Sequence, residues 1–366
     1  MKTGFIGWRG MVGSVLLQRM REEGDFAGLQ PTFFSTSAVG GAGPDVGAGP
    51  TVLADAWDLD ALALHDVIVC CQGGDFTRAT ISDLRESGWT GIWIDAASTL
   101  RMDPDAVLCL DPVNRATIHS ALDAGYKTFV GANCTVSLLL MGLIGLLRTG
   151  RVQWINFASY QAASGGGARK VKELVEQFAH LGDVGKTPHG SVLDLDAAVA
   201  AAMVDSRFPM SEFGAPLAGS ALPWIDRRKS TGQTKEEWKS MAEGNKLLDI
   251  QGSPLPIDGV CVRIGAMRCH AQAVMLKLDQ ALPLHEVEAL IAHAHPWVDV
   301  VPNTQEDTLA RLTPAATAGS LQVAVGRIRT MAMGPEYISL FTVGDQLLWG
   351  AAEPLRRMLQ IVRNRR

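Results

Sequence analysis

The sequence predicts an α/β protein of two domains, the first built on a parallel sheet and the second, an α+β unit, on a mixed or antiparallel sheet. Two patterns lead to this prediction. Up to about residue 133, short apolar strands alternate with helices across glycine-containing turns, as in strand–helix–strand units. Beyond that point, strands carry apolar residues along one face, which is typical of antiparallel pairing. A chain of 366 residues is long enough for two hydrophobic cores.

The first domain can be followed element by element. Residues 2–8 (KTGFIGW) form a short apolar strand, and residues 10–24 form a helix with apolar residues on one face. A second strand, PTFFSTS, follows at residues 31–37 and leads into a glycine- and proline-rich loop. A strand with its turn, a helix and a further strand are then predicted at residues 65–74, 75–88 and 91–98. Strands joined in this way form a Rossmann-type parallel sheet with right-handed crossovers.

The second domain begins with an apolar helix at Cys134. It continues with two strands and two helices, at residues 154–163, 269–278, 191–203 and 234–248. The last segment, residues 345–364, has helical periodicity, and we expect it to pack back on the first domain. The predicted division is therefore residues 1–133, completed by a C-terminal helix at 345–366, and residues 134–344.

Composition and charge argue against several classes of partner and location. The net charge is −5 with no basic cluster, so neither nucleic acid nor an anionic membrane is expected as a partner. The longest apolar run, residues 136–147, is too short to span a bilayer, and the N-terminus lacks the pattern of a signal peptide. Six cysteines in so long a chain fit a reducing cytoplasm, and no cysteine or histidine spacing is typical of a metal site.

Three glycines follow the first predicted strand and open the first helix. Gly7, Gly10 and Gly13 leave the backbone free to approach a pyrophosphate, and the helix N-terminus presents N–H groups and a positive dipole end to it. The spacing is G-x-x-G-x-x-G rather than G-x-G-x-x-G, so the prediction of a dinucleotide site depends on the motif's position between strand and helix. A plain strand-to-helix turn is the alternative.

The end of the second predicted strand carries hydroxyl groups where NAD-specific sites carry an acid. Ser35, Thr36 and Ser37 accept a 2′-phosphate without charge repulsion, and Arg9 in the glycine turn can pair with that phosphate. NADP is therefore favoured over NAD as the cofactor.

Cys134 lies between the turn Gly131-Ala132-Asn133 and the apolar helix. A thiol at a helix N-terminus has a lowered pKa because the helix dipole stabilises the thiolate. A nucleophile of this kind needs a partner that exchanges protons, and histidine suits that role. The alternative is that Cys134 is a small buried hydrophobe, which is what most free cysteines are.

His270 and Arg263, in CVRIGAMRCH, are the leading candidates to share a cleft with Cys134. Their odd separation would place them on opposite faces of one continuous strand, so we expect Gly265 to interrupt it. A satisfied core histidine and a surface ion pair are the alternatives for the two residues.

Two further stretches fit the same cleft. Gln161 ends a predicted strand, and the turn Ser164–Gly167 that follows allows backbone to approach a cofactor or anion. Glu236 and Lys239 lie three residues apart and therefore share one helix face. For this pair the alternative is a solvated surface ion pair.

A set of collinear motifs then carries a resemblance. GFIGWRGMVGSVL, FFSTS, CQGGDFT, WIDAAS-x-LRM, NCTVSLLLM, YQAASGGGAR, PWID, EEWK, CVR-x-GA-x-RCH and FTVGDQLLWGAAEPLRRML extend over nearly the whole chain. Together they resemble the aspartate-β-semialdehyde dehydrogenase family in its Gram-negative bacterial form. The resemblance implies a homodimeric, NADP-dependent enzyme of lysine, threonine and methionine biosynthesis. Its reaction is the reduction of L-aspartyl-4-phosphate to aspartate semialdehyde and phosphate.

The resemblance also assigns roles to residues. It implies that Cys134 is the nucleophile that forms an acyl intermediate and that His270 is the acid and base. The remaining roles are substrate binding by Arg263, which grips the α-carboxylate, with Gln161 and Glu236, the latter pairing with the α-amino group; phosphate binding by Arg101, Asn133 and Lys239; and NADP binding by Gly7, Arg9, Gly10, Met11, Val12, Gly13, Thr36, Ser37, Gln72, Ser164, Gly165 and Gln346.

Two alternatives stay open from the sequence. One keeps the chemistry and changes the substrate, as in N-acetyl-γ-glutamyl-phosphate reductase or a glyceraldehyde-3-phosphate-type dehydrogenase. The other is a non-catalytic NADP-binding sensor, in which Cys134 would have no enhanced reactivity.

Overall fold

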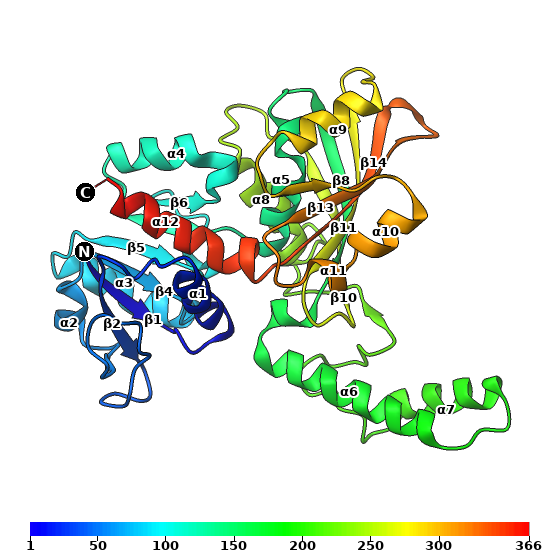
Figure 1. Cartoon of the computed structure of the whole chain (residues 1–366), viewed down its shortest axis with the longest axis horizontal. Helices are drawn as coiled ribbons and strands as arrows, with labels where there is room; N and C mark the ends of the chain where they lie inside the picture. The colour runs from blue at the N-terminus through cyan, green and yellow to red at the C-terminus, as the bar shows by residue number, and fades with distance from the viewer. Residues whose placement is uncertain (366) are drawn as a thin grey trace.

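The computed structural model describes residues 1–365, which fold around two separate sheets. The first sheet and both chain ends lie in one lobe, and the second sheet lies in the other (Figure 1). None of the helices in residues 1–365 has the length and apolar character needed to cross a bilayer. The predicted α/β class, with one parallel and one mixed sheet, is confirmed.

Seven strands, all parallel, form the first sheet in the order β3-β2-β1-β4-β5-β7-β6. The strands are β1 (Lys2–Ile6), β2 (Gln30–Ser35), β3 (Ala54–Asp55), β4 (Val67–Cys70), β5 (Ile92–Asp95), β6 (Ala106–Cys109) and β7 (Thr128–Gly131). The helices between them are α1 (Met11–Glu22), α2 (Leu59–Ala63), α3 (Gly74–Glu86) and α4 (Asp111–Asp123). Strand order reverses between β1 and β4, and the crevice at such a reversal is where open α/β sheets bind ligands.

The C-terminal helix α12 (Glu353–Arg363) lies against the first sheet, beside β4, β5, β6 and β7 (Figure 1). Its apolar residues Leu355, Met358 and Leu359 belong to the same core cluster as Phe5 and Ile94. The segment before it, Leu348–Ala352, is a π-helical turn rather than the start of one continuous α-helix. The boundaries 1–133 with 345–366 and 134–344 stay a prediction.

The second sheet has the order β12-β13-β14-β11-β8-β10-β9 and mixes parallel with antiparallel pairs. The strands are β8 (Val152–Gln161), β9 (Ala221–Leu222), β10 (Ile257–Ile264), β11 (His270–Leu278), β12 (Val298–Val300), β13 (Val323–Met331) and β14 (Gly334–Gly344). β10 ends at Ile264 and β11 begins at His270, so the chain is interrupted around Gly265 as predicted.

Helices cover one face of the second sheet. α5 (Cys134–Leu147) and α9 (Leu284–Ala292) pack there, and α5 runs from the junction of the two lobes into this core. The other helices of this part of the chain are α6 (Ala168–Lys186), α7 (Val192–Val204), α8 (Lys235–Leu247), α10 (Gln305–Arg311) and α11 (Pro314–Thr317). α6 and α7 pack on each other and extend away from the sheets (Figure 1).

Candidate active site

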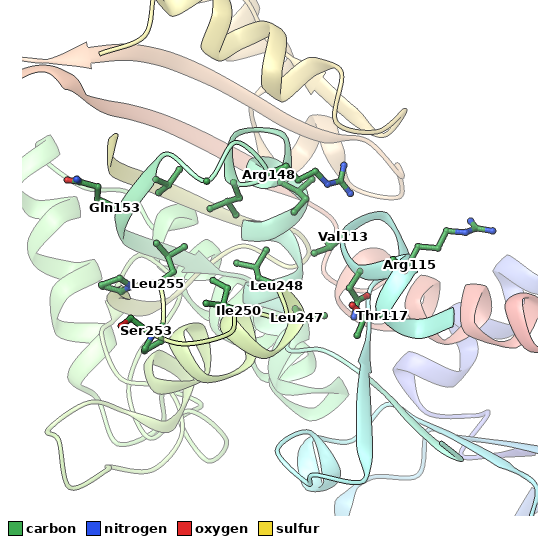
Figure 2. A pocket seen from close by; sticks show the side chains of 18 residues that line it. Val113, Arg115, Thr117, Arg148, Gln153, Leu247, Leu248, Ile250, Ser253 and Leu255 are labelled. Atoms are coloured by element: carbon green, nitrogen blue, oxygen red, sulfur yellow. The ribbon is translucent and has the colours of Figure 1, made fainter. Parts of the chain in front are cut away.

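Two cavities of different character are lined by residues of both lobes. The larger, about 630 Å³, is lined mainly by apolar side chains from α4, α5, α8 and the loop after α8 (Figure 2). Arg115 and Arg148 stand at its edge and extend away from the leucines (Figure 2). It contains neither a cysteine nor a histidine. The smaller cavity, about 380 Å³, lies where the lobes meet and contains Cys134 together with charged side chains. The chemistry therefore points to the smaller cavity.

Cys134 and His270 come together in this cavity from distant parts of the chain. Cys134 is the first residue of α5, and His270 is the first residue of β11. The Cys134 Sγ lies 3.4 Å from the His270 Nε2, within reach of a hydrogen bond to sulfur. The structure therefore brings the two residues into one cavity, as the sequence led us to expect. Cys134 contacts a histidine there rather than filling space among apolar side chains.

The start of α5 is capped by Asn133. Its Oδ1 accepts hydrogen bonds from the amides of Thr135 and Val136, at 2.9 and 3.1 Å. The Asn133 amide itself donates to the buried Glu243 carboxylate at 2.7 Å. Within residues 1–365 this leaves the Cys134 amide as the one at this helix start without an acceptor. A helix start without a cap offers several free N–H groups to an anion, and here the Asn133 side chain and Glu243 leave one of them free.

The ionisation of Cys134 differs from the sequence prediction. Burial raises the pKa of the Cys134 thiol, and the nearby Glu236 carboxylate raises it further. Lys239, Arg101 and Arg263 act in the opposite direction without outweighing these effects. The prediction of a lowered pKa considered only the helix N-terminus, whereas removal from water opposes the thiolate more strongly.

His270 is held as a neutral imidazole. Burial, with the positive charge of Arg263, lowers the pKa of His270 to about 3. The Ala162 amide donates a hydrogen bond to the His270 Nδ1 at 3.1 Å. Because an amide can only donate, Nδ1 accepts, and the ring proton of the neutral form sits on Nε2, toward Cys134.

Arg263 is a buried guanidinium without an acidic partner. Only 6% of the residue is exposed, and its Nη1 donates to the Ala162 carbonyl at 2.5 Å. No carboxylate of the described residues lies within ion-pair distance of it, and burial lowers its pKa. A buried charge is costly unless it is paired, so an unpaired arginine facing a cavity points to an anionic ligand.

Glu236 and Lys239 form a buried pair on α8, contrary to the surface alternative. The Lys239 Nζ donates to the Glu236 Oε2 at 2.8 Å, and both side chains are less than a tenth exposed. Burial raises the pKa of Glu236, but the charge of Lys239 and hydrogen bonds from Lys239 and Asn133 outweigh it and bring the pKa to about 2. A second carboxylate, that of Asp226, lies 3.6 Å from the Lys239 Nζ.

Arg101, Asn133 and Lys239 line the same cavity, where an anion could lie between them. Arg101 is oriented by its Nε bond to the Gly131 carbonyl at 2.8 Å and by an ion pair with Glu243 at 3.3 Å. Three of its five N–H groups are engaged, with the Ala96 carbonyl as the third acceptor, which leaves two for a ligand.

The predicted cofactor residues divide between two cavities. A separate hollow of about 300 Å³ lies at the carboxyl ends of β1, β2 and β4 and includes Gly7, Arg9, Gly10, Thr36, Ser37 and Gln72. The active-site cavity includes Val12, Ser164, Gly165 and Gln346. Met11 begins α1 between the two. A dinucleotide consists of two nucleotides joined by a pyrophosphate. The two hollows can each receive one nucleotide, and the N-terminus of α1, which lies between them, can receive the pyrophosphate.

The glycine turn requires glycine at two of its positions. Gly7 has φ +75°, and a Cβ there would lie 2.4 Å from the backbone of Cys71 and Gln72. A Cβ at Gly13 would lie 2.3 Å from the Gly7 carbonyl oxygen. Gly10 shows no contact as close, and its nearest neighbour would be at 3.3 Å. The cradle therefore has the close backbone approach that a pyrophosphate site needs.

Hydroxyl groups and Arg9 meet at the end of β2. The Arg9 Nη2 donates to Ser35 Oγ at 3.3 Å and to Ser37 Oγ at 3.2 Å. The Gln72 Nε2 donates to Thr36 Oγ1 at 3.2 Å, which links the ends of β2 and β4. These donors and hydroxyls, with no carboxylate among the residues that line the hollow, fit a phosphate group.

Family comparisons agree with this arrangement. The family model for the semialdehyde dehydrogenase NAD binding domain matches residues 2–121, and the model for the semialdehyde dehydrogenase dimerisation domain matches residues 143–349. A solved structure of aspartate semialdehyde dehydrogenase from Francisella tularensis is 46% identical, covers 99% of this chain and 100% of its own, and superposes with a TM-score of 0.96. The chain belongs to the semialdehyde dehydrogenase family. The resemblance predicted from sequence motifs is confirmed.

More distant members of the semialdehyde dehydrogenase family share the fold. Aspartate semialdehyde dehydrogenase II from Vibrio cholerae, complexed with ASA, is 21% identical with a TM-score of 0.79. Aspartate semialdehyde dehydrogenase from Candida albicans, with NADP, is 16% identical with a TM-score of 0.66. Both matches cover 99% of this chain and 98% of the other.

Sequence reasoning missed three residues of this semialdehyde dehydrogenase site. Asp226, in the PWID motif, lines the cavity beside Lys239. Glu243 forms an ion pair with Arg101. It lies one helical turn beyond Lys239 on α8, and this spacing could have predicted that the two residues share a helix face. Gly350, in the π-helical turn, touches Cys134 so closely that a Cβ would lie 2.4 Å from the Cys134 Cβ, a contact no sequence pattern indicates.

Proposed function

We propose that this semialdehyde dehydrogenase reduces L-aspartyl-4-phosphate to L-aspartate-4-semialdehyde and phosphate through a thioester on Cys134. The observation that carries the proposal is a cysteine–histidine pair flanked by two separate anion sites. Arg263 stands without an acidic partner on one side, and Arg101 and Lys239 stand together on the other. A substrate with an α-carboxylate at one end and a phosphate at the other matches this pattern of charges.

NADP is the cofactor that the residues fit. Gly7 and Gly13 provide the backbone cradle, and Arg9 with Ser35 and Ser37 provides donors for a 2′-phosphate. Gln72, Thr36, Val12, Ser164, Gly165 and Gln346 extend the site toward Cys134. When bound, NADPH supplies the hydride that converts the thioester to the aldehyde level.

The nucleophilic step follows from the contacts of Cys134. The His270 Nε2–H and the positive charges of Lys239, Arg101 and Arg263 favour the thiolate once it forms. The thiolate attacks the acyl carbon, a C–S bond forms, and the C–O bond to phosphate breaks. The free Cys134 amide can donate to the oxyanion, and Arg101 and Lys239 can hold the departing phosphate.

His270 fits the acid half of its predicted role. The proton that the Cys134 thiol loses when the thiolate first forms goes to solvent. The His270 imidazole then takes a second proton from solvent and gives one to the leaving phosphate, so that the ring begins and ends the step neutral. After reduction, the C–S bond breaks, the aldehyde leaves and the thiolate is restored. No other proton source is needed, because reduction of the acyl phosphate consumes one proton overall.

Gln346 and Gly165 support this centre from behind. The Gln346 Oε1 accepts from the Cys269 amide at 2.7 Å, and its Nε2 donates to Ser164 Oγ. A Cβ at Gly165 would lie 3.0 Å from Arg263 and from His270. We infer that Gln346 and Gly165 fix the positions of His270 and Arg263 next to the reacting carbon of the substrate and the bound cofactor.

The reverse reaction tests this proposal. Reduction of NADP by aspartate semialdehyde should require inorganic phosphate and should be lost in Cys134→Ser. N-acetylglutamate semialdehyde and glyceraldehyde 3-phosphate should be poor substrates in the same assay. Activity on one of those aldehydes instead would assign the chemistry to a different substrate. Folded protein that binds NADP without oxidising any of the three would favour the sensor.

We also infer that the protein is a homodimer formed through the second sheet. The chain contains the family's dimerisation domain, and the sheet face opposite α5 is only partly covered. This open face is formed by Trp154, Asn156, Ala158, Ala273, Met275, Lys277, Tyr337, Ser339 and Phe341. Sedimentation should give twice the chain mass, and Met275→Asp, in the middle of the face, should give the monomer mass.

A cytoplasmic location belongs to the same proposal. All six cysteines are free, and four of them are fully buried as thiols. This pattern fits a reducing compartment. Fractionation of cells should recover the activity with cytoplasmic markers.

A further inference from the structure

We propose that the larger cavity, of about 630 Å³, is a regulatory site for a small amphipathic anion, an apolar body that carries one carboxylate or similar group. It shares no lining residue with the active-site cavity or with the hollow at the ends of β1, β2 and β4. Its volume lies within the range of about 300 to 1,000 Å³ that is typical of small-molecule sites, which often lie between domains. α5 packs on the sheet face opposite the open one, so a dimer through the open face leaves this cavity accessible.

The wall of the cavity is apolar and comes from both lobes. Val113 belongs to α4 of the first lobe, and the second lobe contributes leucine and isoleucine side chains from α5, α8 and the loop after α8. Leu247, Leu248 and Ile250 lie together in the middle of this wall (Figure 2). Covering such a surface with an apolar ligand removes it from water, which favours binding.

The charges at the mouth of the cavity are positive. Arg115 and Arg148 are the charged residues among those that line it. Arg148 donates to two backbone carbonyls, at 2.8 and 3.3 Å, and no carboxylate within residues 1–365 lies at ion-pair distance from it. Arg115 lies 3.7 Å from Asp111, whose carboxylate pairs more closely with Arg357, at 2.5 and 2.7 Å. Both rim arginines extend away from the leucines (Figure 2), so a ligand with its apolar body inside would present an anionic group to them.

Two helices connect this cavity to the active site. α5 begins at Cys134, and its last turn contributes Ile144 to the cavity. α8 carries Lys239 in the active site and contributes Leu247 at its end, and Leu247 belongs to the same core cluster as Val136, two residues after Cys134. Because a core is close-packed, a ligand between α4 and the ends of α5 and α8 should shift Lys239 relative to the start of α5 and weaken phosphate binding. This coupling rests on the proposed function, whereas ligand binding does not.

Binding can be tested with 8-anilinonaphthalene-1-sulfonate, which combines an apolar aromatic body with one sulfonate. Equilibrium dialysis at saturating NADP, which fills the cofactor hollows, should show one site per chain. Ile250→Trp places a larger side chain in the cavity and should abolish this binding. Leu309→Trp, at a position on α10 that is 66% exposed, is the matched control and should bind like the wild type. Displacement of the probe by NADP, or wild-type binding by folded Ile250→Trp, would overturn the proposal.

The role of the rim arginines is tested with a neutral probe of the same shape, N-phenyl-1-naphthylamine. A variant with Arg115→Gln and Arg148→Gln should raise the Kd of the sulfonate probe about tenfold, in the range for hydrogen bonds to charged groups, and leave the Kd of the neutral probe unchanged. Arg169→Gln, on α6 with its side chain 87% exposed, should change neither Kd. Equal changes for the two probes in the arginine variant, or no change for either, would contradict an anion site. The thermal midpoint of each variant shows whether it is folded.

The regulatory role is tested in the phosphate-dependent reduction of NADP by aspartate semialdehyde. At saturating NADP, the sulfonate probe should raise KM for phosphate about fivefold, at the lower end of the usual coupling between two sites, and should have no effect on Ile250→Trp. A bound probe that leaves KM for phosphate unchanged, or an effect that persists in Ile250→Trp, would overturn this role. Failure of the proposed function is distinct, because the wild type would then not oxidise aspartate semialdehyde, and the dialysis result would still stand.

Discussion

Two buried arginines, Arg263 and Arg356, have opposite surroundings. Arg356 on α12 pairs with Asp25 at 2.5 Å, with Glu353 at 3.1 Å and with Glu23 at 3.4 Å. Arg263 is equally buried and has one carbonyl acceptor. Both residues lost their hydration when the chain folded, but only Arg356 regained opposite charges within the protein.

The difference separates a structural charge from a functional one. The acids around Arg356 fasten the C-terminal helix to the first lobe, with Arg19 joining Glu353 at 2.7 Å. The missing acid at Arg263 is what we assign to the substrate. A buried charge without a partner destabilises the free protein, and such a charge is found where a bound ligand supplies the opposite charge. The lack of an acidic partner at Arg263 therefore indicates a ligand-binding role.

The largest expected effect is at the unpaired arginine. Arg263→Met should lower kcat/KM for aspartate semialdehyde about 10³-fold, because a buried charge contact to the α-carboxylate is lost. The thermal midpoint should not fall, since the substitution removes a charge that the free protein leaves unpaired. Steady-state kinetics and thermal unfolding on one preparation measure both quantities. A lowered midpoint with normal kinetics would reverse the assignment of roles.

The same substitution at the paired arginine should have the opposite result. Arg356→Met leaves the buried Asp25 without its arginine and leaves Glu353 with Arg19 as its remaining partner, which should lower the free energy of unfolding by about 3 kcal/mol. Activity of the folded fraction should be unchanged, because Arg356 lies outside the cavity. Urea unfolding and kcat/KM at a temperature well below the midpoint test this, and reduced kcat/KM in fully folded protein would contradict it.

A smaller effect is expected from acid. The pKa of His270 is lowered to about 3, so between pH 6.5 and pH 4.5 the unfolded chain binds a proton that the folded protein does not. Stability therefore falls as pH drops through this window, by up to about 1.4 kcal/mol per pH unit. From pH 6.5 to pH 5.0 the wild type should lose about 2 kcal/mol more than His270→Gln. Equal losses in both proteins would show that His270 is protonated in the folded state.

The smallest effect should come from an exposed pair. Lys172 and Glu176 on α6 are 3.7 Å apart with largely solvated side chains. Lys172→Ala should change the free energy of unfolding by about 0.5 kcal/mol or less and leave activity unchanged. Urea unfolding measures this difference. A loss of unfolding free energy as large as that expected for Arg356→Met would mean that solvent exposure does not distinguish weak ion pairs from strong ones.

The sequence was most informative where its patterns are long or local. The apolar strands and the glycine turn of the first lobe were predictable, because alternation of strand and helix and the needs of Gly7 and Gly13 are properties of neighbouring residues. β6 and β7 were not identified, although β4 and β5, which were predicted, have the same length, so the length of a strand does not decide whether the sequence reveals it. The π-helical turn before α12 was predicted as ordinary helix because it lies within the helical periodicity of residues 345–364, which does not separate the two kinds of turn.

The site was predictable in its members and less so in their states. Cys134, His270 and Arg263 were identified by residue type and motif, and the break at Gly265 was expected from their spacing. The raised pKa of Cys134 was not, because burial depends on packing that no local pattern records.

The central claim is that Cys134 forms a covalent thioester with the substrate, and the direct measurement is to trap it. Enzyme mixed with L-aspartyl-4-phosphate in the absence of NADPH should release one equivalent of phosphate per active site. The peptide that contains Cys134 should gain the mass of one aspartyl group, and Cys134→Ser should show neither change. Phosphate release without a modified peptide, or modification of another cysteine, would contradict the account.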